Sequence, residues 1–245
     1  MPTDAPAAPI SSAEGRAWLW AALLLSGALS ALLILRSPCI GKDGPTFLWM
    51  AQGLERDFGA TIRAADQHPG YPMLVLAAHR VARVLGAPEG NAAWALVGRL
   101  VSALFGALLV WAVWEAGRRL FDARAAGIAA ALVAVLPAFS ASASDVWSDT
   151  PHLFFHVLCA GLLIAGLQRR RWTWFLGAGL AGGLAFWIRP EGLTPVLAGG
   201  IVLVWRAASC PEVRRAALVG ILCLAAGALA LVLPYTAIKG KLTSK

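Results

Sequence analysis

Seven apolar stretches of the sequence approach the length of a membrane-spanning helix, and they constrain the fold more than any other feature. A span needs about 17–25 apolar residues to cross a hydrocarbon core about 30 Å thick. Backbone amides in lipid must be hydrogen-bonded within their own segment, so helix is the expected state. We therefore predict an all-α polytopic bundle with about seven spans, at residues 18–35, 94–116, 125–141, 151–167, 172–188, 192–205 and 216–238.

The composition also indicates a membrane protein. Hydrophobic residues make up 59% of the chain and charged residues only 14%, whereas soluble domains carry about 25% charged residues. The net charge of +8 would suit a nucleic-acid partner, but no basic stripe with interleaved aromatic residues is present. We therefore expect no nucleic-acid partner. The four cysteines form no CxxC pair and predict no metal site.

Arginine clusters predict the orientation of the chain. Arg-rich connections at 118–124, 169–171 and 206–215 alternate with connections that hold few basic residues. Because basic loops stay in the cytoplasm, we expect these connections and the N-terminus on the cytoplasmic side of a bacterial inner membrane. Residues 1–16 are rich in Pro, Ala and Ser, which predicts a disordered cytoplasmic tail, and residues 17–245 form the predicted transmembrane domain.

The connection between the first two spans, residues 37–93, is long and polar and faces outward in this orientation. Residues 47–58 and 71–85 have helical patterns that include charged side chains, so we predict two interfacial helices. An Arg at mid-membrane costs about 2.5–3.5 kcal/mol on insertion scales, which argues against 71–85 as a span. The first loop is therefore expected to lie on the outer membrane surface.

Three polar clusters share this predicted outer surface. Carboxylate, imidazole and guanidinium groups above apolar helices suit a site for a polar group carried by a lipid. Arg is suited to a phosphate because its planar fork donates two parallel hydrogen bonds. The candidate residues are Asp43, His68 and Tyr71 in the first loop, Asp145, Asp149 and His152 around the start of the fourth span, and Arg189 with Glu191 after the fifth.

Several of these residues also have a purely structural interpretation. Asp43 can be a turn residue, Asp149 can cap the helix that begins near Pro151, and Arg189 can extend to the interface from a helix end. Asp149, His152 and His156 share one helical face and could together bind a metal. Arg99, one turn inside the second span, is a further candidate for phosphate.

The order of these sequences resembles the bacterial GT-C membrane glycosyltransferases, and more narrowly their protein-O-mannosyltransferase and aminoarabinose-transferase group. The matching elements, between residue 18 and the end, are an Asp after the first span, HPGYP, GRRLFDARAAGIAAALVAVLPAF, SDTPHLF and RPEG. The resemblance implies that Asp43 is, or helps to position, the catalytic base. It also implies that Asp149 is a second catalytic acidic residue, with Asp145 as its substitute, and that Arg189 contacts a lipid phosphate.

The resemblance further implies an inverting transfer of a sugar from polyprenyl phosphate to a glycan, lipid or protein acceptor, and it leaves open a divalent cation as cofactor. Gly44 replaces a second acidic residue that many relatives have. Relatives are usually much longer, so we expect the chain to correspond to their N-terminal half, truncated at its C-terminus. The alternatives are a transporter- or flippase-like module for lipid-linked sugars and a non-catalytic subunit.

Overall fold

The computed structural model describes residues 12–41 and 43–242, and all regular elements of these residues are helical. The predicted all-α class is confirmed. Residues 1–11 of the predicted tail lie outside the described residues, and the first helix begins at Ser12. The helices are α1 (Ser12–Arg36), α2 (Gly44–Arg56), α3 (Phe58–Ala64), α4 (Gly70–Val84), α5 (Asn91–Leu120), α6 (Ala123–Val135), α7 (Pro137–Ser144), α8 (Asp149–Arg169), α9 (Trp172–Ile188), η1 (Pro190–Leu193), α10 (Thr194–Ser209), η2 (Pro211–Val213) and α11 (Arg214–Lys239).

Each predicted span falls on helical residues, one of them on a bent pair of helices, although the number seven is not confirmed. Within the described residues, five segments are long and apolar enough to cross a membrane: most of α1, the whole of α5 and α8, η1 with α10, and η2 with α11. A sixth results if the bent pair α6 and α7 counts as one span, and α9 is apolar but only 17 residues long. The protein is therefore a multi-pass membrane protein.

The prediction of one continuous helix over residues 125–141 is wrong. Helix α6 ends at Val135, and α7 begins at Pro137 with a bend of 60° between the two. Leu136, between them, has an extended backbone with φ −65° and ψ 123°. Proline has no N–H to donate and disfavours the helical conformation in the residue before it, so the break falls at Leu136.

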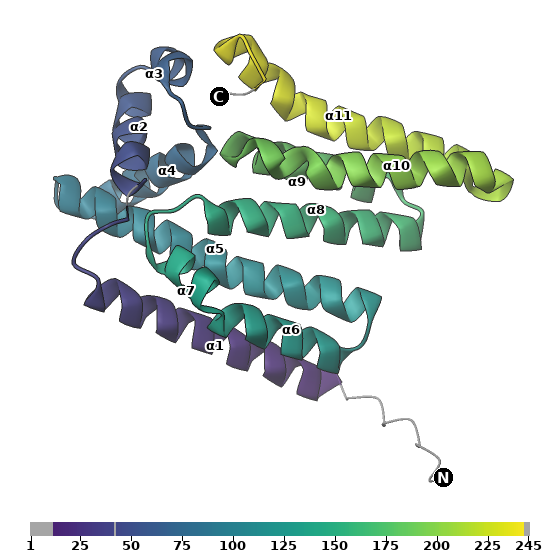
Figure 1. Ribbon diagram of the computed structural model, residues 1–245, viewed down its shortest axis with the longest axis horizontal. Helices are drawn as coiled ribbons and strands as arrows, with labels where there is room; N and C mark the ends of the chain where they lie inside the picture. Colours follow the sequence, from purple (N-terminus) through teal and green to yellow (C-terminus); the bar gives the residue numbers. More distant parts are fainter. Residues whose placement is uncertain (1–11, 42, 243–245) are drawn as a thin grey trace.

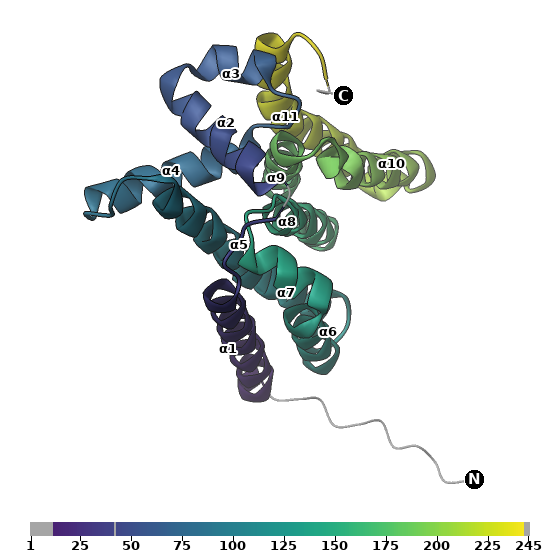
Figure 2. The same cartoon turned by 60° about the vertical axis from the view of Figure 1, so that its left-hand side comes forward.

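The long helices run side by side, and the first loop gathers at one end of them. Figure 1 shows α2, α3 and α4 at the end where α1, α9 and α11 finish and where α5, α8 and α10 begin. The Arg-rich connections lie at the opposite end. In the turned view of Figure 2, α1, α6 and α7 lie on one side of α5, and α9, α10 and α11 lie beyond α8.

The two predicted loop helices are present. The first corresponds to α2, and it is followed by a short helix, α3, that was not predicted. Asp57 separates the two: it accepts a hydrogen bond from the backbone N–H of Ala60 at 2.9 Å and caps α3. Helix α4 buries Val75 and Leu76 against the neighbouring helices, whereas Arg80 is exposed on its outer face. This division of apolar and charged faces is that of an amphipathic helix, and its placement at the membrane surface stays a prediction.

Helices α9 and α11 approach closely at two glycines. A Cβ atom on Gly179 would fall well inside van der Waals distance of the Leu224 carbonyl oxygen, and one on Gly227 would do the same at Leu176. Small residues at such crossings let helix backbones in a membrane pack directly against each other. The contact matters for the site because α9 and α11 both end at the first loop.

We expect Gly179→Ala to destabilise the protein by about 1–3 kcal/mol, because the added methyl group overpacks a contact with backbone atoms. Gly177→Ala on the same helix is the matched control, since its Cβ would lie 3.6 Å from a Leu162 methyl group, an ordinary contact. Thermal unfolding in detergent would measure both variants. Equal midpoints for the two would contradict the importance of this crossing.

Candidate functional site

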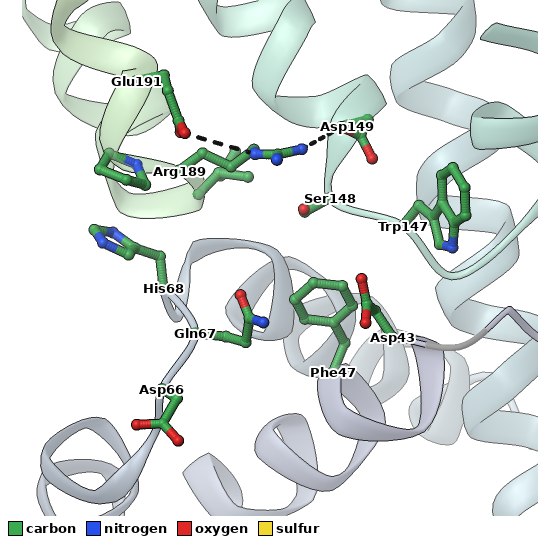
Figure 3. Close-up of a pocket in the computed structure, with 12 residues that line it drawn as sticks. Asp43, Phe47, Asp66, Gln67, His68, Trp147, Ser148, Asp149, Arg189 and Glu191 are labelled. Carbon is green, nitrogen blue, oxygen red and sulfur yellow. Dashed lines mark hydrogen bonds and ion pairs between the residues drawn. The ribbon is translucent and has the colours of Figure 1, made fainter. Parts of the chain in front are cut away.

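A cavity of about 320 Å³ lies between the first loop and the ends of α8 and α9. Figure 3 shows residues of the loop on one side of it, facing Asp149, Arg189 and Glu191 on the other. Five of the eight predicted site residues therefore line a single cavity. Its lining consists of Asp43, Phe47, Asp66, Gln67, His68, Trp147, Ser148, Asp149, Ile188, Arg189, Pro190 and Glu191.

Asp43 holds the N-cap position of α2, and its side chain is exposed. The carboxylate makes no capping hydrogen bond with the helix that it precedes. Pro45, in the first turn, has no N–H that would need such a bond. The Asp43 carboxylate is therefore available to a molecule in the cavity. A residue that served only to form the turn would not need an available carboxylate.

Asp145 supports the turn before Asp43 and does not line the cavity. Its Oδ2 accepts a hydrogen bond from the Gly41 N–H at 2.7 Å, and its Oδ1 accepts one from the Val146 N–H at 2.7 Å. A Cβ at position 41 would lie 2.6 Å from Asp145 Oδ2 and 2.7 Å from Trp147 Nε1. A side chain at position 41 would displace these two groups, so the backbone at Gly41 lies directly against the connection between α7 and α8.

Arg99, on α5, holds the same segment from another side. It is 8% exposed, and it donates hydrogen bonds to the carbonyl oxygens of Ser37 at 2.9 Å and Cys39 at 2.5 Å. These carbonyls follow the end of α1, where helical partners run out. Arg99 was a candidate for phosphate, but its guanidinium contacts the backbone that leads to Asp43 and lies outside the cavity lining.

Arg189 lies at the end of α9, between two carboxylates. Its Nη1 donates to Asp149 Oδ1, and its Nε is 3.9 Å from Glu191 Oε2 (Figure 3). Ser148 takes the N-cap position of α8, so Asp149 is fixed by the ion pair and not by a capping bond. The half-buried guanidinium is held in place at the cavity, and both carboxylates restrict its direction.

His68 attaches the first loop to the ends of α9 and α11. Its Nδ1 is 2.8 Å from the Phe186 carbonyl oxygen, and its ring stacks on Tyr235 with centroids 4.9 Å apart. A carbonyl can only accept, so Nδ1 carries the hydrogen. Burial lowers the pKa of His68, more than the hydrogen bond to Phe186 and the charge of Glu191 raise it. The imidazole is therefore neutral at neutral pH.

The shifted pKa of His68 predicts a loss of stability on acidification. The folded protein binds the proton more weakly than the unfolded chain, whose His pKa is about 6.5. The contribution of His68 to stability is complete above that pH and is lost as the pH falls toward the pKa of the folded state. We expect His68→Asn, which can still donate to Phe186, to lose less stability than the wild type between pH 7.5 and 5.5. Parallel unfolding midpoints for both proteins would contradict this.

Two further predicted residues, Tyr71 and His152, lie outside the cavity lining. The Tyr71 hydroxyl is fully buried, 3.0 Å from Gly98 O and 2.9 Å from Ser102 Oγ, and burial raises its pKa. His152 is buried between α8 and α9, with Nδ1 3.4 Å from Ala185 O. Tyr71 therefore joins α4 to α5, and His152 joins α8 to α9. Among the described residues, no three His, Cys, Asp or Glu side chains are grouped to hold a metal ion.

The candidate set from the sequence did not include several residues that shape the cavity. Phe47 follows Asp43 by one helical turn, a spacing that could have indicated it. Trp147 lies between the predicted Asp145 and Asp149. No sequence pattern indicates Lys239, whose ammonium group at the end of α11 donates to the carbonyl oxygens of Ile62 and Ala65 at the end of α3 and so joins the first loop to α11.

Comparison with known proteins agrees with this architecture. Residues 67–237 match the family described as dolichyl-phosphate-mannose-protein mannosyltransferase, which is more than half of the 245 residues. The chain belongs to this family. The match includes the residues from Gln67 to Glu191 that line the cavity, and it begins after Asp43. No curated protein sequence matches the chain.

Among solved structures, this member of the mannosyltransferase family is similar to the apo oligosaccharyltransferase of Archaeoglobus fulgidus, with a TM-score of 0.71 and 18% sequence identity. The alignment covers 90% of this chain and 30% of the oligosaccharyltransferase chain. At this identity the similarity shows the fold alone. Both the family and the solved structure are of the GT-C superfamily, so the resemblance seen in the sequence is confirmed.

Proposed function

We propose that the protein transfers a sugar from a polyprenyl phosphate donor to an acceptor hydroxyl at the outer face of a bacterial inner membrane, with its N-terminus in the cytoplasm. One observation carries this proposal: a single cavity at one end of an apolar bundle presents Asp43 opposite the ion pair of Asp149 and Arg189. Family membership supports glycosyl transfer. The lipid tail of such a donor would lie along the apolar helices of residues 17–245, with its phosphate at the cavity.

In the proposed reaction, Asp43 acts as the general base. The acceptor oxygen bonds to the anomeric carbon as its proton passes to the Asp43 carboxylate. The bond between the anomeric carbon and the phosphate oxygen breaks, and its electron pair leaves with the polyprenyl phosphate. Displacement from the opposite side inverts the configuration at the anomeric carbon. General-base help of this kind contributes about 10²–10⁴-fold to the rate.

Arg189 stabilises the charge that develops on the leaving phosphate. A guanidinium offers five N–H donors in a fixed plane, and Asp149 and Glu191 engage two different nitrogens of it, Nη1 and Nε. The remaining donors stay directed by this pairing and need no reorganisation during the reaction, which is the condition for strong electrostatic stabilisation. Asp149 is thus proposed to act both beside the substrate and through its hold on Arg189.

The first loop completes the site by covering the sugar. His68 joins the loop to the end of α9, and Lys239 joins it to the end of α11. Helices α2, α3 and α4 would thus form a cover that is attached to these two helix ends. Water competes with the acceptor for the same anomeric carbon, and a closed cover would exclude it. Glycan, lipid and protein acceptors all offer hydroxyl groups and are the candidate partners.

The experiment that tests this function uses membranes from cells that express the gene encoding this chain. Radiolabelled polyprenyl phosphate sugars are added, and label is followed into protein, glycan and lipid fractions. We expect label in one acceptor class, with release of polyprenyl phosphate, and none in membranes without the gene. Transfer of the intact labelled lipid between leaflets, without release of phosphate, would instead favour the transporter alternative.

A further inference from the structure

A second cleft, of about 230 Å³, lies between the last third of α5, the middle of α8 and the start of α9. Figure 1 shows that α5 ends and α9 begins at the end of the bundle opposite the first loop. Its walls are almost entirely apolar, and two small residues, Ala116 on α5 and Gly161 on α8, provide the space. A Cβ on Gly161 would lie in ordinary van der Waals contact with the Ala116 Cβ, at 3.8 Å, so the missing methyl group leaves a narrow gap between the two helices. The lining consists of Trp111, Ala112, Glu115, Ala116, Arg119, Val157, Leu158, Gly161, Leu162 and Trp174.

The rim of this cleft carries an excess of positive charge. Arg118 and Arg119 share the single carboxylate of Glu115. The guanidinium carbon of Arg119 lies 5.7 Å from the Trp174 ring centroid, and that of Arg169 lies 5.2 Å from it. Arg169 is exposed and has no carboxylate partner among the described residues. Where α5 and α8 end, three guanidinium groups are thus balanced by one carboxylate, which pairs with two of them.

We propose that this cleft binds one anionic phospholipid, with an acyl chain between α5 and α8 and the phosphate between Arg119 and Arg169. The apolar walls suit an alkyl chain. The two guanidinium groups suit a phosphate, because both can donate charge-assisted hydrogen bonds to its oxygens. Tryptophan prefers the level of the headgroups, which places Trp174 beside the glycerol region. The lipid neutralises the rim and fills the space between the two helices.

The charge of the rim decides between an anionic and a zwitterionic lipid. Anionic headgroups are attracted to exposed basic side chains near a membrane surface by about 1 kcal/mol per Lys or Arg. A zwitterionic headgroup brings its own cation and gains little from Arg169. The binding does not depend on sugar transfer, since the cleft and the candidate site lie at opposite ends of the bundle.

Native mass spectrometry of the purified protein with phosphatidylglycerol or phosphatidylcholine of identical acyl chains tests the proposal. We expect the wild type to retain one phosphatidylglycerol and to bind it on the order of tenfold more tightly than phosphatidylcholine. Arg169→Gln, an exposed side chain without an ion pair, removes this preference. Arg80→Gln, exposed on α4 at the other end and paired with Glu55, is the control and keeps it.

A second variant tests the apolar part of the cleft. Ala116→Leu fills the space between α5 and α8, and we expect it to weaken retention of both lipids. Gly27→Leu on α1, where a Cβ meets no atom within 4 Å, is the control and leaves retention unchanged. Equal affinity of the wild type for the two lipids, or an unchanged preference in Arg169→Gln, would overturn the proposal.

Discussion

Asp43→Asn is expected to lower the rate of sugar transfer by about 10²–10⁴-fold, the usual contribution of a general base. Asparagine has nearly the same shape and can occupy the same N-cap position, but it cannot take the proton of the acceptor. Because Asp43 is exposed and makes no capping bond, folding should be little affected. The measurement is the initial rate of transfer from labelled donor in membranes that hold equal amounts of each protein.

Glu55→Gln is the matched control, since it removes a carboxylate from the same loop. Glu55 is exposed and lies 3.6 Å from Arg80, outside the cavity lining, so transfer should continue at the wild-type rate. A near-normal rate for Asp43→Asn would remove Asp43 from the role of base. A comparable loss in Glu55→Gln would show that the loop responds to any change of charge.

Gly41→Ala separates the position of Asp43 from its chemistry. This variant keeps the carboxylate, but its Cβ would collide with Asp145 Oδ2 and Trp147 Nε1 and so displace the turn. A misplacement of about 1 Å can cost about 10²-fold in rate, and we expect a loss of that order. Gly27→Ala, in open space on α1, controls for the substitution itself.

Arg189→Gln is expected to lower kcat by about 10²–10³-fold, with a smaller effect on the KM for the donor. The reason is that a fixed donor acts mainly on the charge that develops in the transition state. Arg189→Lys should recover only part of the rate, because an ammonium group keeps the charge but not the planar fork. Steady-state kinetics with varied donor concentration would measure both parameters.

The control for this substitution is Arg206→Gln, which removes the same charge near the end of α10, at the opposite end of the bundle. We expect its kcat and KM to match those of the wild type. Unfolding midpoints must accompany the kinetics, since Asp149 and Glu191 lose their cation in Arg189→Gln. An unchanged kcat in a folded Arg189→Gln protein would exclude Arg189 from stabilising the leaving phosphate.

Most of the long helices were predictable from the sequence alone, although several of their bounds were not. Long apolar stretches determine helices, because lipid leaves the backbone no other source of hydrogen bonds. The same patterns placed Asp149 and Arg189 at helix ends, and the charged pattern of residues 71–85 predicted α4. The break at Leu136 was also accessible, since Pro137 was visible in the middle of a predicted span.

Only the tertiary structure decided which polar side chains face one cavity. Asp149 and Arg189, on separate helices, meet because α8 packs against α9. Asp145 and Arg99 turn toward the backbone before Asp43, and Tyr71 turns into the core. The pattern of a sequence predicts which residues reach a surface, but the direction of each side chain depends on neighbours supplied by other helices. A buried or half-buried polar group takes the partner that this packing brings within hydrogen-bonding distance.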